Sequence, residues 1–342
     1  MPHYNLAFLG FGNVGKALAE LLLRKAADIE TKRGVTFRVT GIATGSRGSA
    51  INPNGIDLRN ALERVKNNQR LEELNLRSAT CNDSLEFIQT CNADVLFETI
   101  PVNYESGQPA IDYIRAALEM GMHVTTANKG PVVHGYHELT ALAKAKGRKF
   151  YFESAVMDGA PVFGLFRETL PAANLTALRG VLNSTTNLLL SRMEDGESFE
   201  DAVAYAQSIG IAETDPSGDV DGWDAAIKVC ALVSVMMGVP LKPHDVDRTG
   251  IGGISLEDVA QAKAEGKRWK LVCEAVREQN QVRARVAPQK VGVESPLFGV
   301  MGTTSIVEFE SDVLGKLSLI EADPGPHTTA YGLLADFLNA VA

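Results

Sequence analysis

The sequence predicts an α/β protein built from two domains, a doubly wound parallel sheet followed by an α+β domain with a mixed sheet. Three observations lead to this prediction. The chain has 342 residues, more than one hydrophobic core usually holds. Short apolar runs alternate with helical patterns up to about residue 153, as in a parallel sheet with helical crossovers. Beyond that point apolar runs follow one another in pairs, which favours antiparallel strands.

The composition limits the partners that the protein can have. With 45% hydrophobic and 22% charged residues it is an ordinary globular chain, and its net charge of −9 argues against nucleic acid or an anionic membrane. No apolar run approaches the ~20 residues of a membrane span, and the opening MPHYN leads into a strand, not a secretory signal. The cysteines are Cys81, Cys91, Cys230 and Cys273. They form no CxxC pair and no zinc-ligand spacing, so we expect reduced thiols in a cytoplasmic protein.

The first two predicted elements carry a nucleotide-binding signature. An apolar run at residues 6–9 predicts a strand, GFGNVG follows at residues 10–15, and a helical pattern covers about residues 14–26. A strand, a glycine-rich turn and a helix in this order are typical of the Rossmann dinucleotide-binding unit. The residues predicted to hold the dinucleotide are Gly10, Phe11, Gly12, Asn13, Val14 and Gly15. The alternative is a glycine-rich turn that binds nothing.

Each glycine of this loop has a physical reason. Gly10 allows the tight turn, Gly12 lets the backbone approach a pyrophosphate, and Gly15 allows the helix to pack closely on the strand. The N-terminus of the helix then presents its unpaired N–H groups to the phosphates. The loop therefore predicts a cofactor that contains a pyrophosphate.

The second strand, predicted at residues 37–44, indicates which dinucleotide binds. An NAD-binding unit usually carries an acidic residue near the end of this strand. Here the chain has Thr44, Ser46 and Arg47, and hydroxyl groups with a guanidinium suit a 2′-phosphate. We therefore predict NADP as the cofactor, with NAD as the alternative. The alternative for Arg47 is a solvated charge on a loop.

The remaining strands of the first sheet bring further polar residues to one edge. The predicted strands lie at 94–100, 123–126 and 150–154, and the helices at 58–67, 84–91, 109–120 and 135–146. Ligands of such sheets bind beyond the carboxyl ends of the strands, where Thr99, Ile100 and Lys129 stand. We predict that these three residues contact the cofactor, and the alternative for Lys129 is a solvated loop lysine. The first domain is expected to end near Glu153.

The second domain is predicted to span residues 154–327, with the final helix, within 328–342, packing back on the first domain. Its helices are expected at 161–169, at 199–211 and from about 223, and its strands at 177–183, 269–277, 282–287, 304–310 and 316–321. The strand at 177–183 ends in the polar cluster STTN, and a helix follows.

The stretch from Gly210 to Gly238 holds the strongest candidate for a catalytic site. Its first half is a polar loop with carboxylates at Glu213, Asp215, Asp219 and Asp221. Its second half is a helical pattern in which Asp224 and Lys228 lie one turn apart on one face. The pattern is apolar from 229 to 237 apart from Ser234, so the helix is buried, and charges at its start are paired or line a cavity. The alternative is a helix-start salt bridge worth about 0.3–0.5 kcal/mol.

With these residues identified, the chain resembles the homoserine dehydrogenase family over nearly its whole length. The matching segments are GFGNVG at the nucleotide loop, TANK (126–129) at the lysine-bearing turn, FESAV (152–156) at the entry to the catalytic domain and LNSTTN (182–187) at the substrate loop. The most specific match is GIAETDPSGDVDGWDAAIK (210–228). LFGVMGTTSIVEF (297–309) and HTTAYGLLADFL (327–338) resemble the C-terminal segments. The chain resembles a short form, without a kinase domain or a C-terminal regulatory domain.

The resemblance implies a reversible, NAD(P)-dependent interconversion of L-homoserine and L-aspartate 4-semialdehyde in threonine and methionine biosynthesis. It also implies a homodimer formed through the sheet of the second domain. By match, Lys228 transfers the proton, Lys129 assists near the nicotinamide, and Asp224 pairs with the lysines or with the substrate.

The same match implies ligands for the substrate, the cofactor and a cation. Those for the substrate are Glu213 and Asp215, at its ammonium and hydroxyl end, together with Ser184 and Thr185 in its pocket. Gly325 is implied as a cofactor contact. The segment that runs from Glu153 to Val156 matches a structural site for a monovalent cation, Na+ or K+.

The sequence departs from the family pattern at positions near the expected pocket. They are Met157, Asp158, Ser184, Ile211 and the turn PGPH at 324–327. A sister NADP-dependent dehydrogenase of another hydroxy amino acid is therefore one alternative. A second is a non-catalytic NADP-binding sensor, which the intact Lys129, Asp224 and Lys228 argue against. A phosphorylating semialdehyde dehydrogenase would need a thiolate nucleophile, and the four cysteines are expected to be structural.

Overall fold

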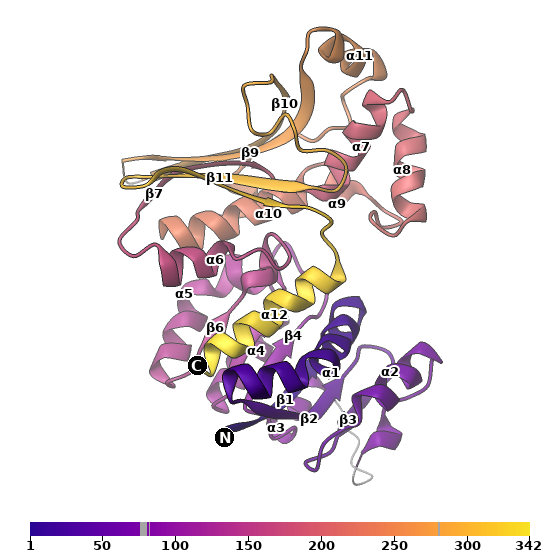
Figure 1. Ribbon diagram of the computed structural model, residues 1–342, viewed down its shortest axis with the longest axis vertical. Helices are drawn as coiled ribbons and strands as arrows, with labels where there is room; N and C mark the ends of the chain where they lie inside the picture. The colour runs from indigo at the N-terminus through magenta and orange to yellow at the C-terminus, as the bar shows by residue number, and fades with distance from the viewer. Residues whose placement is uncertain (76–80, 82, 280) are drawn as a thin grey trace. The chain divides into compact units, whose positions relative to one another are not determined.

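A computed structural model of the protein describes residues 1–75, 81, 83–279 and 281–342 (Figure 1). The chain divides into two compact units. Unit 1 contains Met1–Pro161 and Gly325–Ala342, and unit 2 contains Val162–Pro324. Within the ranges just given, none of the helices combines the length and the apolar character that a membrane span requires.

Unit 1 is built on a sheet with the strand order β3-β2-β1-β4-β5-β6. Its strands are β1 His3–Leu9, β2 Thr36–Ala43, β3 Ser49–Ile51, β4 Val95–Glu98, β5 His123–Thr126 and β6 Phe150–Tyr151. All neighbours pair in parallel except β3, which runs antiparallel to β2 at the sheet edge. The predicted doubly wound parallel sheet is therefore confirmed. Because β1 lies between β2 and β4, the strand order reverses at its carboxyl end, where such sheets bind their ligands.

Helices cover this sheet and complete its core. They are α1 Asn13–Arg33, α2 Leu58–Lys66, α3 Ser84–Thr90, α4 Ala110–Glu119, α5 Lys129–Ala145 and α12 Pro326–Ala340. The C-terminal α12, yellow in Figure 1, packs along α1 and inserts Phe337 into the core. The Phe337 ring is fully buried and meets Tyr4, Phe37 and Phe97 edge-to-face at centroid distances of 6.1–6.2 Å. The last helix is thus part of the first hydrophobic core.

Two elements of unit 1 differ from the prediction. Helix α5 begins at Lys129 and not near residue 135, because the Oδ1 atom of Asn128 caps it by accepting the N–H of Gly130 at 3.0 Å. Gly130 and Pro131 look like helix breakers in the sequence, so the helix was predicted to begin after them. Proline is nevertheless tolerated in the first turn of a helix. The strand predicted at 150–154 ends at Tyr151, and a 3-10 turn over Glu153–Ala155 takes its place.

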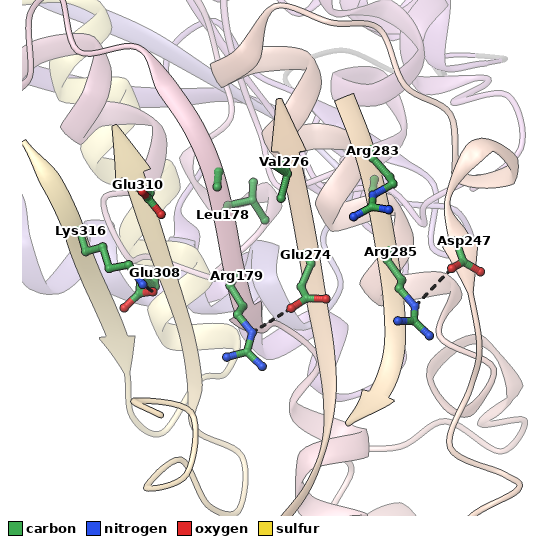
Figure 2. A pocket seen from close by; sticks show the side chains of 12 residues that line it. Leu178, Arg179, Asp247, Glu274, Val276, Arg283, Arg285, Glu308, Glu310 and Lys316 are labelled. Atoms are coloured by element: carbon green, nitrogen blue, oxygen red, sulfur yellow. Dashed lines mark hydrogen bonds and ion pairs between the residues drawn. The ribbon is translucent and has the colours of Figure 1, made fainter. Parts of the chain in front are cut away.

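Unit 2 contains the predicted mixed sheet, with the order β12-β11-β7-β9-β10-β8. Its strands are β7 Leu175–Val181, β8 Asp247–Arg248, β9 Arg268–Glu278, β10 Gln281–Val291, β11 Ser305–Ser311 and β12 Gly315–Glu321. The pairs are antiparallel apart from β8, which runs parallel to β10. One face of this sheet carries alternating charges and is hollowed by a pocket of about 420 Å³ (Figure 2).

The α-helices of unit 2 are α6 Val162–Gly164, α7 Ser184–Glu194, α8 Phe199–Ser208, α9 Ser217–Val220, α10 Trp223–Leu232 and α11 Leu256–Ala264. The π-helices η3 Leu165–Thr169 and η4 Val233–Met237 continue α6 and α10. Helix α10 begins at the predicted residue, and from Ala225 to Leu232 it is buried except for Lys228. The polar cluster after β7 forms the first turn of α7. Both α7 and α10 contact β9, and their starts meet where Asn183, the N-cap of α7, donates to Asp224 in the first turn of α10. Helix α11 has no counterpart in the prediction.

Candidate active site

The nucleotide loop joins β1 to α1, and its glycines have distinct surroundings. Gly10 has φ +101°, and a Cβ there would lie 2.7 Å from the backbone of Thr99. A Cβ on Gly15 would lie 2.7 Å from the carbonyl oxygen of Gly10. A Cβ on Gly12, in contrast, would meet nothing within 4 Å. Two of the glycines are therefore required by the protein itself, whereas Gly12 opens onto space that a pyrophosphate would fit.

Helix α1 begins directly behind this space. Gly12 is its N-cap and offers no side-chain bond to the first turn, so the helix N-terminus presents N–H groups to an anion. The ring of Phe11 is only 4% exposed and packs edge-to-face on Phe8, so this residue contributes its backbone alone. Val14 packs against the core, whereas Asn13 lines a cavity of about 710 Å³ together with Lys16. The open space at Gly12 and the uncapped first turn of α1 suit a pyrophosphate, whereas the cavity at Asn13 is also lined by Glu20 and Glu63.

The loop after β2 is held by its own hydrogen bonds. The hydroxyl of Thr44 donates to the carbonyl of Gly48 at 2.9 Å and accepts the N–H of Arg47 at 2.8 Å. The guanidinium of Arg47 donates to Oδ1 of Asn68 at 2.6 Å. Arg47 is half-buried, and Ser46 is exposed. Thr44 therefore shapes the loop, and Asn68 anchors the guanidinium of Arg47, whose contact with a 2′-phosphate stays a prediction.

A buried carboxylate organises the carboxyl ends of β4 and β5. Glu98 is fully buried and accepts hydrogen bonds from the N–H of Ile100, the hydroxyl of Thr126 and the amide of Asn128. Burial raises the pKa of Glu98 to about 7, although these three donors oppose the shift. Through Asn128, which caps α5, this network fixes the backbone at Lys129, the first residue of the helix.

Thr99 joins this network to the nucleotide loop. Its N–H donates to the carbonyl of Leu9 at 2.8 Å, and its hydroxyl donates to the carbonyl of Gly10 at 3.0 Å. Unit 1 thus brings the nucleotide loop, Thr99, Ile100 and Lys129 to one edge of its sheet, as predicted. The organising role of Glu98 was missed, because a glutamate inside an apolar strand gives no motif.

The catalytic candidates of unit 2 form one cluster at the starts of α7 and α10. The ammonium of Lys228 donates to the carbonyl of Leu182 at 2.6 Å and lies 3.0 Å from Oδ2 of Asp224. The amide of Asn183 donates to Oδ2 of Asp224 at 3.0 Å and to Oδ1 of Asp219 at 2.6 Å. The side chains of Lys228 and Asp224 are only 14% and 12% exposed, which distinguishes this pair from a solvated salt bridge.

Asp219 was not assigned a role from the sequence. Burial and the neighbouring carboxylate of Asp224 raise its pKa, whereas bonds from Asn183 and Thr185 oppose the shift. The short helix α9 turns Asp219 toward Asn183, and a helix of this length leaves little periodic signal. The spacing between Asp219 and Asp224 in the acidic loop was the one available clue.

The structure leaves Glu213 and Asp215 outside this cluster. Both are exposed, and Oδ1 of Asp215 accepts the N–H of Ser217 at 3.0 Å, a bond that lowers the pKa of Asp215. Their roles at the substrate remain predictions. Thr185 is 5% exposed, and its hydroxyl donates to the carbonyl of Ile211 at 3.4 Å. Ile211 departs from the family pattern, and it takes part in this contact through its backbone and not through its side chain.

The remaining predicted residues lie in the turn after β6 and at the start of α12. Glu153 and Val156 are buried, and the N–H of Glu153 donates to Oδ2 of Asp336 at 2.7 Å. Over the described ranges no three His, Cys, Asp or Glu side chains gather as metal ligands, and the cation stays a prediction. Gly325 is the N-cap of α12, whose Thr328 hydroxyl also bonds Asp158 at 3.1 Å.

A dinucleotide loop in unit 1 and a buried lysine–carboxylate cluster in unit 2 define an NAD(P)-dependent oxidoreductase. Family models refine this class. The model described as "Homoserine dehydrogenase, NAD binding domain" matches residues 10–153, and the model described as "Homoserine dehydrogenase" matches residues 161–338. The chain belongs to the homoserine dehydrogenase family.

Known proteins resemble the chain over its full length. An "NAD(+)-dependent homoserine dehydrogenase" from Pseudomonas canavaninivorans is 34% identical over 341 residues, which cover 99% of this chain and 96% of the relative. A homoserine dehydrogenase from Methanocaldococcus jannaschii is 34% identical over 339 residues, 98% of each chain. A hyperthermophilic archaeal homoserine dehydrogenase, solved in complex with NADPH, superposes with a TM-score of 0.83 at 30% identity and covers 99% of this chain and 98% of its own. The resemblance drawn from the sequence motifs is therefore confirmed.

Proposed function

We propose that the protein oxidises L-homoserine reversibly to L-aspartate 4-semialdehyde with NADP. The observation that carries this proposal is the charge of the cluster in unit 2. Asp219 and Asp224 supply two carboxylates, whereas Lys228 supplies one cation, which leaves one negative charge in excess among these three side chains. A buried excess charge calls for a partner of opposite sign. The ammonium of a hydroxy amino acid supplies that partner, and a plain hydroxy acid does not.

Lys228 is suited to transfer the proton of the substrate hydroxyl. An ammonium has three N–H donors, and the contacts with Leu182 and Asp224 use two of them. The third is available to a substrate oxygen, so the ammonium can give a proton to the carbonyl in the reduction, and the neutral amine can accept the hydroxyl proton in the oxidation. A bound nicotinamide dinucleotide supplies the hydride acceptor. Around it, Lys129, Thr99 and Ile100 would orient the nicotinamide end.

The test of this function is NADPH formation by the purified protein with L-homoserine, beside L-threonine, L-serine and other hydroxy amino acids. Turnover with L-homoserine supports the proposal. Turnover with another member of the panel alone would instead support a sister dehydrogenase, the alternative that Met157 and Ser184 motivate. NADPH binding without any turnover would indicate a non-catalytic sensor.

The preference for NADP rests on Arg47. Its guanidinium is held by Asn68 beside the end of β2, where the ribose of a dinucleotide lies in this fold. We expect Arg47→Ala to weaken NADP binding by about 10–100-fold, because a charge-assisted bond to phosphate contributes roughly 1.5–3 kcal/mol. NAD lacks the 2′-phosphate and should lose little. Titration of both cofactors against wild type and variant checks this, with Arg59→Ala, on α2, as the control. Equal losses for NADP and NAD would contradict the 2′-phosphate assignment.

We also propose a homodimer through the charged face of the unit 2 sheet, which Figure 2 displays. Arg179 pairs with Glu274 at 2.9 Å and Arg285 with Asp247 at 3.2 Å, so these charges are already partly neutralised for burial. Val276 opens onto the pocket at 41% exposure. An open sheet face with neutralised charges and exposed apolar side chains suits a second copy of itself.

Two apolar side chains of this face offer a test. Ile320 is 64% exposed and lies on the same face of β12 as Lys316, which lines the pocket. We expect the double variant Val276→Glu/Ile320→Glu to sediment as a monomer, because it would bury like charges in a self-complementary interface. The control is Ile209→Glu at the end of α8, where the wild-type residue is 48% exposed. A wild-type monomer, or a dimer that survives the double substitution, would refute the interface.

The compartment is also a proposal. All four cysteines are free in the structure, which agrees with a cytoplasmic protein.

A further inference from the structure

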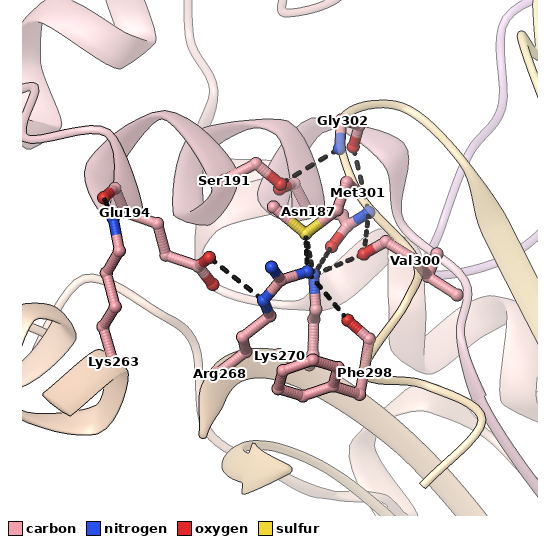
Figure 3. A network of polar contacts seen from close by, with 10 residues as sticks. All are labelled: Asn187, Ser191, Glu194, Lys263, Arg268, Lys270, Phe298, Val300, Met301 and Gly302. Carbon is pink, nitrogen blue, oxygen red and sulfur yellow. Dashed lines mark hydrogen bonds and ion pairs between the residues drawn. The ribbon is translucent and has the colours of Figure 1, made fainter. Parts of the chain in front are cut away.

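A buried lysine outside the catalytic cluster holds together three segments of unit 2 (Figure 3). Lys270, on β9, has no exposed surface. Its ammonium donates to Oδ1 of Asn187 at 2.8 Å and to the carbonyl of Val300 at 2.5 Å, and it lies 3.6 Å from the sulfur of Met301. It therefore joins β9, helix α7 and the loop before β11.

The acceptors of this ammonium are neutral, which makes its burial costly. Glu194 attracts it from a distance and Arg268 repels it, while Arg268 itself pairs with Glu194 at 3.3 Å. Burial lowers the pKa of Lys270 to about 8. An apolar side chain in this position would avoid that cost. The lysine must therefore supply something that an apolar residue does not, namely directed hydrogen bonds.

Those hydrogen bonds determine how Asn187 is oriented. Because Oδ1 faces Lys270, the amide nitrogen of Asn187 is turned to the loop and donates to the carbonyls of Gly302 at 3.0 Å and Thr304 at 3.1 Å, with that of Val300 at 3.4 Å. The ammonium of Lys270 binds the same loop, residues 300–304, by donating to the carbonyl of Val300. The loop from Val300 to Thr304 is thus fastened to α7 through Asn187 and Lys270, and the Ser191 hydroxyl of α7 also accepts the N–H of Gly302 at 3.0 Å.

Helix α7 connects this clamp to the substrate cluster. Asn187 is one turn from Asn183, the N-cap of α7, whose amide binds both Asp219 and Asp224. The turn between them carries Thr185 and Ser184, and the Ser184 hydroxyl lies 3.3 Å from that of Ser305, the first residue of β11. A shift of the first turn of α7 would therefore move the donors that hold the two carboxylates.

We propose that Lys270 is a positioning residue of the substrate site, which clamps Asn187 and the 300–304 loop and thereby fixes the first turn of α7 against Asp219 and Asp224. The inference rests on the proposed function, because the site that it positions is the homoserine site. Lys270 takes no part in proton transfer. It acts on substrate affinity, since misplacement of a binding group by a fraction of an ångström weakens binding steeply.

The test compares Lys270→Met with Lys263→Met in the full-length protein. Lys263 donates to the carbonyl of Glu194, at the opposite end of α7, and serves as the matched control. We expect Lys270→Met to raise the KM for L-homoserine on the order of tenfold, with the Kd of NADPH unchanged. Lys263→Met should leave both constants at wild-type values. A wild-type KM in folded Lys270→Met would overturn the proposal.

Hydrogen exchange supplies a readout that does not depend on turnover. We expect Lys270→Met to speed exchange at the backbone amides of residues 183–187 and 300–304, whereas Lys263→Met should leave these amides unchanged. Unchanged protection in Lys270→Met would overturn the clamp. If the wild-type protein did not turn over homoserine, the proposed function would fail while this exchange result still judged the clamp.

A second variant guards against misfolding. Asn187→Asp keeps an acceptor for Lys270 and pairs it with a charge, but it removes the donor to Gly302 and Thr304. We expect the same rise in KM and the same faster exchange at 300–304. Wild-type KM and wild-type protection in Asn187→Asp would refute the loop half of the clamp.

Discussion

Replacing Lys228 by alanine should lower kcat by about 10²–10⁴-fold, the usual contribution of a positioned proton-transfer group. The ammonium of Lys228 contacts Asp224 within the substrate cluster, and a methyl group in its place moves no proton. The loss should appear in kcat at saturating homoserine, because the carboxylates that bind the substrate ammonium remain. Stopped-flow measurement of NADPH formation would separate chemistry from product release.

Cofactor binding distinguishes this prediction from a collapse of the fold. The Kd of NADPH should be unchanged in Lys228→Ala, since the nucleotide loop and Arg47 belong to unit 1. Lys228→Arg is the matched control, because it keeps the charge beside Asp224 but transfers a proton poorly. A kcat within a factor of a few of wild type in the alanine variant would remove Lys228 from the proton-transfer role.

Replacing Asp219 by asparagine should raise the KM for L-homoserine by about 30–100-fold, the effect of losing a charge-assisted bond of roughly 2–3 kcal/mol. The substitution would also place a second amide beside that of Asn183, which now donates to the carboxylate at 2.6 Å. The matched variant is Asp215→Asn, in the same loop but exposed. The larger rise should come from the change at Asp219. A larger rise in KM in Asp215→Asn than in Asp219→Asn would indicate that Asp215 binds the substrate ammonium, as the family pattern implies.

The same carboxylate predicts the acid side of the pH profile. Burial and Asp224 raise the pKa of Asp219, so protonation begins at a higher pH than for an ordinary aspartate. A protonated carboxyl cannot pair with an ammonium. The KM for homoserine should therefore rise as the pH falls through this raised pKa, and Asp219→Asn should lack that dependence. A parallel pH profile in both proteins would assign the titration to another group.

The elements that the sequence predicted well are those with a local signal. The strand, turn and helix around Gly12 follow from glycine spacing and hydrophobic period, and α10 begins where Trp223 ends the polar loop. The pairing of Asp224 with Lys228 follows in the same way from their spacing on one helix. Such features depend mainly on a few residues that are neighbours in the sequence.

What escaped prediction depends on contacts between distant segments. Asn183 meets Asp219 across 36 positions of sequence, and Lys270 meets Asn187 across 83. The LNSTTN segment contains Asn183 and Asn187 but does not show what they contact, and Lys270 stands in no motif. Lys270 in particular lies in a strand that looks like plain core, where a lysine would be taken for a surface residue. These side chains bind several distant segments only once the chain has folded.

The C-terminal helix gives the first unit an unusual assembly order. Phe337 completes the aromatic core around Phe97, yet it is synthesised long after the strands that it covers. Unit 2 is inserted between the two parts of unit 1. When the first 161 residues have left the ribosome, the core of unit 1 therefore still lacks α12. Unit 2 is one continuous segment and can fold before α12 has been synthesised. The hydrophobic core beneath the predicted dinucleotide site is therefore completed only when α12 packs on unit 1.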